Sequence, residues 1–229
     1  MEQLSPQVMH RLVFAVLMQH LPETQTGPAL QLLSDALSHS QNQVRELAVV
    51  AISELPAPPP RRVAALAPAL KDSSARVRRR AARAIGDQGP AAQAVLAQLM
   101  AGLRDVDASV RRDCASALGR LGNAAAACAP LLVNMLSDVE TRTRAVVAVS
   151  LKRIGKATIP ALLNGLFATS QHVRERSASI LRQLAPDDDR ISDAIRVAGI
   201  DVNNVCDEAM LATRTPPPTD FPSRMTISV

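Results

Sequence analysis

Residues 70–89 read LKDSSARVRRRAARAIGDQG, and the same pattern returns twice further along the chain. Residues 103–122 read LRDVDASVRRDCASALGRLG, and residues 136–155 read LSDVETRTRAVVAVSLKRIG. Each stretch begins with Leu, has Asp two positions later and Arg six positions after that Asp, and ends in Gly. The interval between the starts of the first two stretches equals the interval between the second and the third. A fixed period of this length predicts a repeat architecture, in which every unit is one supersecondary element.

The period extends beyond these three stretches on both sides. An apolar residue or Thr followed by Arg recurs at a constant interval through four units and at a slightly shorter one before the fifth. Further small or apolar side chains follow four and eight positions after the residue that precedes each of these Arg. This i, i+4, i+8 spacing predicts an amphipathic helix in each unit, and the closing Gly is a typical helix stop. The first members of the helical column are Val44, Val77, Val110, Thr143 and Val173.

A second apolar segment precedes each of these helices and ends in a Leu, at Leu37, Leu70, Leu103, Leu136 and Leu166. Each unit is therefore predicted to be a hairpin of two helices. A single hairpin cannot bury its own apolar face, whereas hairpins stacked in series can. The low content of aromatic residues (1%) and the absence of Trp and Tyr also favour close-packed helices over a β-sandwich or barrel. We expect an all-α, right-handed α-solenoid of about five hairpins with capping helices.

The three quoted stretches resemble the HEAT-repeat family, and in particular the short bacterial HEAT-like repeats, over roughly residues 28–186. In that family the Asp and Arg of each unit belong to a ladder of hydrogen-bonded ion pairs that joins successive repeats. The first unit departs from the pattern with His39 ahead of Arg45, and the last has no Asp ahead of Arg174. The resemblance implies a structural ladder made by Asp72, Arg78, Asp105, Arg111, Asp138 and Arg144.

A stack of repeats has two apolar ends that need covers. Residues 1–27 are predicted to hold an N-terminal capping helix, because Ser5 and Pro6 suit a helix start and an apolar run follows. Residues 28–186 are predicted to form the five repeats. Residues 187–212 are predicted to form two short C-terminal capping helices, with aspartates 187–189 and Asp201 as caps. The proline-rich residues 213–229 are expected to be a disordered tail.

Two columns of the second helix change chemistry from unit to unit while their neighbours stay apolar, as a surface does. One contains Leu47, Arg80, Asp113, Val146 and Arg176, and the other begins with Val50 and Arg83. The resemblance implies that the second helices line the concave, ligand-facing surface. The mixed strip fits a protein or peptide with acidic and apolar groups, and the partner-binding residues that we predict are Leu47, Val50, Arg76, Arg79, Arg80, Arg83, Arg112, Asp113, Val146, Val149 and Arg176.

Nucleic acid is the main alternative partner, because the chain is most basic in its centre. Residues 61–120 carry a net charge of +7, against +5 for the whole chain, and such a surface attracts phosphates. However, acidic residues interrupt the basic columns, and no aromatic platform is available for stacking bases. The interpretation that we favour is therefore a non-enzymatic HEAT-repeat scaffold or adaptor that binds a protein or peptide, with nucleic-acid binding as the alternative.

The sequence shows no constellation that indicates catalysis, a metal or another cofactor. It has no CxxC or HExxH motif and no P-loop, and none of its four His is followed by Glu, the pair that di-iron hydroxylases with similar repeats use. A lyase resembling the bilin lyases, which share these repeats, stays a second alternative. Three scattered Cys and the lack of a signal-peptide pattern favour a reducing, cytoplasmic compartment without membrane attachment.

Overall fold

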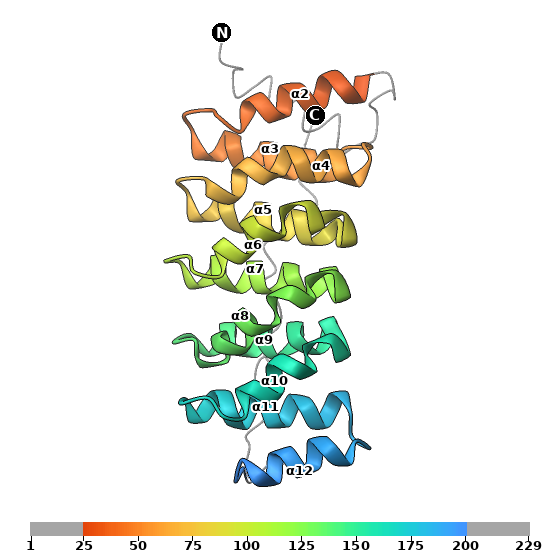
Figure 1. Cartoon of the computed structure of the whole chain (residues 1–229). Helices are drawn as coiled ribbons and strands as arrows, with labels where there is room; N and C mark the ends of the chain where they lie inside the picture. Colours follow the sequence, from red (N-terminus) through yellow and green to blue (C-terminus); the bar gives the residue numbers. More distant parts are fainter. Residues whose placement is uncertain (1–24, 201–229) are drawn as a thin grey trace, which may run out of the picture.

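The structure of the protein, a computed structural model, describes residues 25–200 of the 229-residue chain. These residues form five helical pairs stacked in series, with one further helix at the C-terminal end (Figure 1). We call the first helix of each pair the A helix and the second the B helix. The predicted helix over residues 5–21, the predicted capping helix after Asp201 and the tail 213–229 lie outside the described residues.

The B helices are continuous α-helices of 13 or 14 residues. They form where the repeat period places apolar residues one turn apart. In the second unit Val77, Ala81 and Ile85 are fully buried, which is the stripe that the spacing predicts. The B helices are α3 (Asn42–Glu54), α5 (Ala75–Asp87), α7 (Ala108–Leu121), α9 (Thr141–Ile154) and α11 (Gln171–Leu184).

The A helices are shorter, and most are broken into α and 3-10 segments. Pro130 and Pro160 lie in the first turn of their α-segments, where the missing N–H has no intrahelical partner to lose. Pro68 lies where the A helix of the second unit tightens from α to 3-10, because it cannot donate to the carbonyl one α-turn back. The A helices are α2 (Thr26–Ala36); α4 (Pro59–Leu66) with η2 (Ala67–Lys71); η3 (Gly89–Val95) with α6 (Leu96–Gly102); η4 (Gly122–Cys128) with α8 (Ala129–Asn134) and η5 (Met135–Ser137); and η6 (Gly155–Thr158) with α10 (Ile159–Gly165).

A glycine at one repeated position makes the turn from the B helix to the next A helix after α5, α7 and α9. Gly89, Gly122 and Gly155 have φ angles of +58°, +58° and +87°. Only glycine adopts such angles without a steric penalty. The three turns therefore share a positive φ angle at the same position of the repeat.

The core is one continuous layer between the A and B helices. Leu33, Ile52, Leu66, Ile85 and Leu99 are completely buried in it. Adjacent B helices approach each other closely where both carry small residues. A Cβ atom added at Gly119 would lie 2.8 Å from the Cα of Ser150 on the next B helix. The alanine-rich composition thus serves close helix packing.

Helix α12 (Asp189–Val197) follows the last B helix and buries Ile191 and Ile195. The side chain of Asp188 caps its N-terminus by accepting a hydrogen bond from the N–H of Arg190. Within residues 25–200 the structure contains helices and turns but no strand, and the predicted all-α solenoid is confirmed. In this range no helix has the length and apolar content needed to cross a membrane.

Candidate functional site

The recurring contact between repeats is an arginine ladder on the edge formed by the turns from A to B helices. Each arginine pairs with an aspartate of the next repeat through two nitrogen–oxygen contacts. In the pair of Arg78 and Asp105 these are 2.7 Å from Nε to Oδ2 and 2.8 Å from Nη2 to Oδ1. The same arginine donates from Nη1 to the carbonyl oxygen of Asp72 in its own repeat, at 2.8 Å. The ladder consists of Arg45–Asp72, Arg78–Asp105 and Arg111–Asp138.

These ion pairs are nearly closed to solvent, which perturbs both partners. Burial acts to raise the pKa of Asp105, but hydrogen bonds from Arg78 and from the N–H of Asp107, together with the charge of Arg78, lower the pKa overall. The pKa values of Asp72 and Asp138 are lowered for the same reasons. In return, the hydrogen bond to Asp105 raises the pKa of Arg78. The ladder therefore connects one repeat to the next through groups that are charged at neutral pH.

The structure corrects the sequence-based ladder at its start. The prediction left Arg45 out because His39 stands where later repeats have Asp, yet Arg45 makes the first rung with Asp72 at 2.7 Å. The reason is that each arginine uses the carboxylate of the following repeat and needs only a main-chain carbonyl from its own. His39 supplies that carbonyl, at 2.8 Å from Nη1 of Arg45. Arg144, predicted as a ladder residue, donates to the carbonyl of Asp138 at 2.9 Å in the same way.

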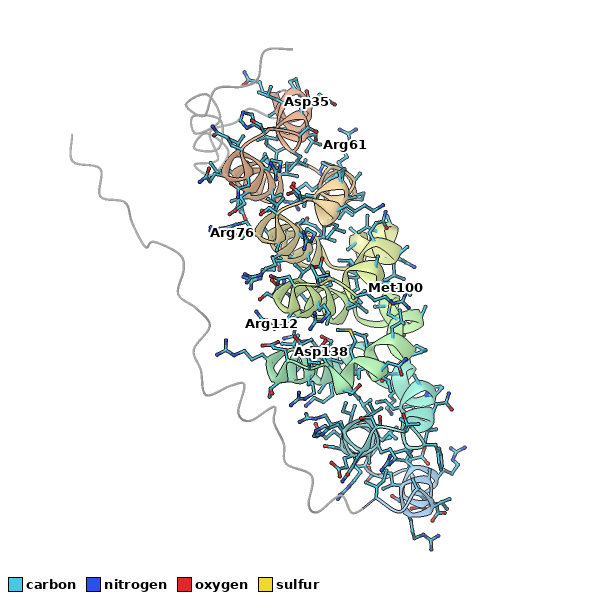
Figure 2. All side chains as sticks on the ribbon, turned by 90° about the vertical axis from the view of Figure 1, so that its left-hand side faces the viewer. Asp35, Arg61, Arg76, Met100, Arg112 and Asp138 are labelled. Atoms are coloured by element: carbon cyan, nitrogen blue, oxygen red, sulfur yellow. The ribbon has the colours of Figure 1, made fainter. Side chains whose placement is uncertain are left out.

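The predicted partner-binding arginines form one face of α5, and we call Arg76, Arg79, Arg80 and Arg83 the arginine face. They lie at i, i+3, i+4 and i+7 and so share one side of the helix. Figure 2 shows Arg76 on the B-helix side of the solenoid, opposite Arg61 and Met100 on the A-helix side. The side chains of Arg76, Arg80 and Arg83 are 71%, 45% and 49% exposed.

Two buried carboxylates hold these arginines, one from each neighbouring repeat. Glu46 on α3 contacts Nε of Arg76 at 3.3 Å and Nε of Arg80 at 3.1 Å. Asp113 on α7 contacts Nε of Arg79 at 3.1 Å and Nε of Arg83 at 3.0 Å. The arginine face is thus a built structure that spans three repeats.

Two predicted surface residues are buried, and one important residue was missed. Asp113 is 5% and Arg176 7% exposed, so the prediction that they face a ligand is wrong. Asp113 lies between the stems of two arginines from the preceding repeat, and Arg176 is enclosed in the packing around α11. Sequence reasoning did not single out Glu46. The sequence does contain a signal for these ion pairs, because Glu46 and Arg80 are separated by the length of one repeat plus one residue, and so are Arg79 and Asp113.

Apolar side chains flank the arginine face along the stack. Leu47 on α3 and Val146 on α9 occupy the same column as Arg80 and are half-buried against the core. Val50 and Val149, one turn further along their helices, are also half-buried. These four predicted residues are therefore partly open to solvent, at the repeat positions that Arg80 and Arg83 occupy on α5.

Arg112, on α7, completes the predicted set. Its Nη1 lies 3.4 Å from both carboxylate oxygens of Glu140, at the start of the next B helix. Arg120 pairs with Asp87 in a similar way at the other end of the B helices. Much of the central positive charge is thus matched by carboxylates of adjacent repeats.

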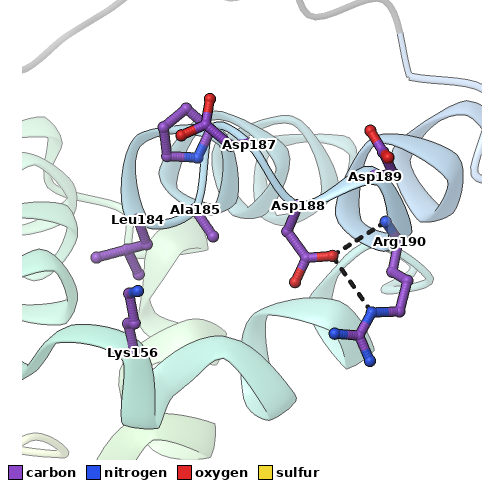
Figure 3. Close-up of a pocket in the computed structure, with 8 residues that line it drawn as sticks. Lys156, Leu184, Ala185, Asp187, Asp188, Asp189 and Arg190 are labelled. Carbon is purple, nitrogen blue, oxygen red and sulfur yellow. Dashed lines mark hydrogen bonds and ion pairs between the residues drawn. The ribbon is translucent and has the colours of Figure 1, made fainter.

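Two hollows lie away from this face. One, of about 600 Å³, lies at the turn between α11 and α12 and is lined by Lys156 and aspartates 187–189 (Figure 3). There Asp188 accepts from the N–H and from Nε of Arg190, at 3.1 and 3.4 Å, so it acts as a helix cap. The second, of about 500 Å³, lies beside the ladder at Asp105 and Asp138. Across residues 25–200, no three His, Cys, Asp or Glu side chains are grouped to hold a metal ion.

The described cysteines have the environment of core residues. Cys114 packs against Gly102, and burial, with the nearby charges of Asp113 and Asp105, raises the pKa of its thiol to about 12. Burial also raises the pKa of Cys128. Thiolate, the nucleophilic form, is therefore scarce at both positions near neutral pH.

Comparison with known proteins identifies the repeats. Residues 63–152 match the family of HEAT repeats, which agrees with the resemblance seen in the sequence. Among curated protein sequences, none matches the chain.

Solved structures of repeat proteins share the architecture. An engineered protein is 17% identical, with a TM-score of 0.53, over 86% of this chain and 93% of its own. The protein YibA of Escherichia coli is also 17% identical, with a TM-score of 0.52, over 93% of this chain and 86% of its own. At this identity the likeness defines the fold, a scaffold of stacked helical repeats, and function has to be argued from the surface.

Proposed function

We propose that this protein is a non-enzymatic scaffold that binds a protein or peptide partner along the B-helix face. The observation that supports the proposal is the order of side chains on that face. Exposed arginines on α5 lie, in the order of the stack, between half-buried apolar residues on α3 and α9. The repeat positions of Val77, Ala81 and Ile85, beside them on the same helices, are buried in every repeat. Protein-binding surfaces typically combine apolar anchors with arginine in this way.

A binding role also accounts for the regularity of the interior. The ladder, the turn glycines and the small residues between B helices hold successive repeats in one fixed relation. A rigid array presents its outer side chains at set spacings, which reduces the entropy lost when a partner binds. The raised thiol pKa values of Cys114 and Cys128 favour a structural over a catalytic role for them.

The proposal can be tested by selecting displayed random peptides on the immobilised full-length chain. Selected peptides are then measured against Val146→Glu and against Met100→Glu. Both residues are half-buried and pack on the core, but Met100 lies on the A-helix side (Figure 2). We expect Val146→Glu to abolish binding and Met100→Glu to preserve it. Peptides that bind both variants as well as the wild type would contradict the proposed face.

Nucleic acid remains the second candidate because of the exposed arginines on α5. The two candidates differ in salt dependence. A surface that neutralises many phosphates loses affinity steeply between low and physiological salt. Fluorescence anisotropy with labelled DNA and RNA at two salt concentrations measures this directly, with an Arg76/Arg80/Arg83→Glu variant as the control. Tight, salt-sensitive binding that the variant abolishes would favour nucleic acid.

A further inference from the structure

We propose that the arginine face of α5 is a preset binding site for an acidic peptide segment, with Glu46 and Asp113 as its positioning residues. The inference deepens the proposed function and rests on it, because it names the chemistry of the partner at one place on the B-helix face. The repeat pattern does not require a carboxylate in the column of Glu46, since the fourth repeat has Ala145 there.

The contacts leave the outer edges of the arginines open to a ligand. Each of the four arginines comes closest to its carboxylate through Nε, the guanidinium nitrogen nearest the side-chain stem. Arg79 and Arg80 donate a hydrogen bond from this atom, and Arg76 and Arg83 make ion pairs. The carboxylates lie beneath them, with side chains only 9% and 7% exposed for Glu46 and Asp113. A guanidinium fixed at Nε retains donors on its outer edge. Arginines oriented in this way lose less conformational entropy when an external carboxylate binds.

The charges of the cluster do not balance. Four guanidinium groups face two carboxylates, so the cluster has an excess of two positive charges. It therefore complements a ligand that brings two negative charges. Two neighbouring carboxylates on a peptide meet this need, and each can form paired hydrogen bonds with a guanidinium.

The surroundings favour a peptide over a nucleic-acid duplex. A duplex laid along the solenoid would pass from α5 onto Leu47 and Val50 on one side, and onto Arg112 and Val146 on the other. The apolar positions offer phosphates no partner, and Arg112, unlike the α5 arginines, faces Glu140 through Nη1, at the outer end of its guanidinium group. A peptide with apolar residues on both sides of its acidic pair would match each of these surfaces in turn.

The repeat spacing sets the length of such a peptide. Leu47, Arg80 and Val146 occupy one column in the first, second and fourth repeats. Packed helices are about 8–10 Å apart, and an extended chain advances about 3.3 Å per residue, so one repeat corresponds to about three residues. The expected segment has an apolar residue about three positions from its acidic pair on one side and another about six positions away on the other.

The test uses a labelled eleven-residue peptide with leucine at its two ends, glutamate at its fourth and fifth positions, and serine or glycine elsewhere. Its affinity for the full-length chain is measured by fluorescence anisotropy. Arg80→Gln with Arg83→Gln should weaken binding about tenfold, since each exposed charge pair contributes modestly. The control, Arg61→Gln with Arg104→Gln, removes the same charge from exposed positions elsewhere and should leave the affinity unchanged.

Glu46→Gln separates positioning from simple charge. This variant makes the chain more positive, so a merely electrostatic surface would bind the peptide more tightly. A preset site should bind it more weakly, because Arg76 and Arg80 lose their common anchor. Tighter binding by Glu46→Gln, or equal losses in the two double variants, would overturn the inference. So would double-stranded DNA that binds as tightly as the peptide and depends on the same arginines.

Failure of this inference is distinguishable from failure of the proposed function. If the glutamate peptide does not bind, the acidic site is wrong, whereas peptides selected on the whole face can still lose binding in Val146→Glu. If no selected peptide responds to Val146→Glu or to the α5 variants, the B-helix face itself is wrong. Circular dichroism of each variant confirms that the helices are intact before any affinity is compared.

Discussion

Replacing Asp105 with alanine tests how strongly the ladder fastens one repeat to the next. The substitution removes both oxygens that Arg78 contacts at 2.7 and 2.8 Å, and also the acceptor for the N–H of Asp107 at 2.9 Å. The two charged side chains are only 13% and 12% exposed, so water does not simply take the place of the lost carboxylate. Arg78 keeps its hydrogen bonds to the carbonyls of Asp72 and Ser73.

The magnitude follows from these contacts. Breaking a fully buried ion pair costs about 3–5 kcal/mol, and an exposed pair contributes about 0–1 kcal/mol. The pair of Arg78 and Asp105 lies between these limits, because it is bidentate and nearly buried but its arginine keeps main-chain partners. We expect the free energy of unfolding to fall by about 2–3 kcal/mol. For a chain of this size that corresponds to a decrease of about 5–10 °C in Tm.

Urea and thermal unfolding followed by circular dichroism measure the effect, since the chain contains no Trp or Tyr for fluorescence. The matched control is Asp193→Ala, because Asp193 pairs with Arg196 at 2.8 Å on an open surface where the two side chains are 66% and 79% exposed. It should cost less than about 0.5 kcal/mol. If Asp105→Ala were no more destabilising than Asp193→Ala, the ladder would not couple the repeats and the reasoning would be refuted.

Three further predictions concern other features of the stack. The pKa of each ladder aspartate is lower in the folded than in the unfolded state, so the stabilisation by the ion pair is present above about pH 4 and is lost as the pH falls below that value. The urea concentration at the unfolding midpoint should therefore be constant near neutral pH and fall in acid. A midpoint that stayed constant in strong acid would contradict this prediction. Gly119→Ala places a Cβ atom 2.8 Å from the backbone of Ser150 and should lower the free energy of unfolding by about 1–3 kcal/mol. The control Gly27→Ala, whose Cβ atom would have no neighbour within 4 Å, should not destabilise the protein. Equal effects of the two variants in thermal melts would show that the B helices can separate freely. The buried thiol of Cys114, with its pKa raised to about 12, should resist a thiol-specific reagent at mildly alkaline pH in the folded protein and react fully in urea, as mass spectrometry of the labelled peptide can show.

Much of the fold can be predicted from the amino-acid sequence, because each repeat is built from local contacts. The spacing of Val77, Ala81 and Ile85 predicts a helix and its buried side, and Gly89 marks the turn that follows. Whether a helix position is buried depends more on the apolar character of the residues at that repeat position than on which residue of the neighbouring helix it contacts. Repetition of that column in five units then leaves stacking as the way to bury every face.

The pairing of charges between repeats needed the three-dimensional structure. Arg45 pairs with Asp72 slightly less than one repeat ahead, and Glu46 pairs with Arg80 slightly more than one repeat ahead. These pairs meet because the stack packs the A-to-B turn and the B helix of one repeat against the B helix of the repeat before it, and this contact is a property of the packed interface. The local pattern showed four arginines on one side of α5 but could not show that buried carboxylates from both neighbours hold them. It placed Asp113 on the surface for the same reason: whether a polar residue is exposed depends on the side chains that the adjacent repeat lays over it.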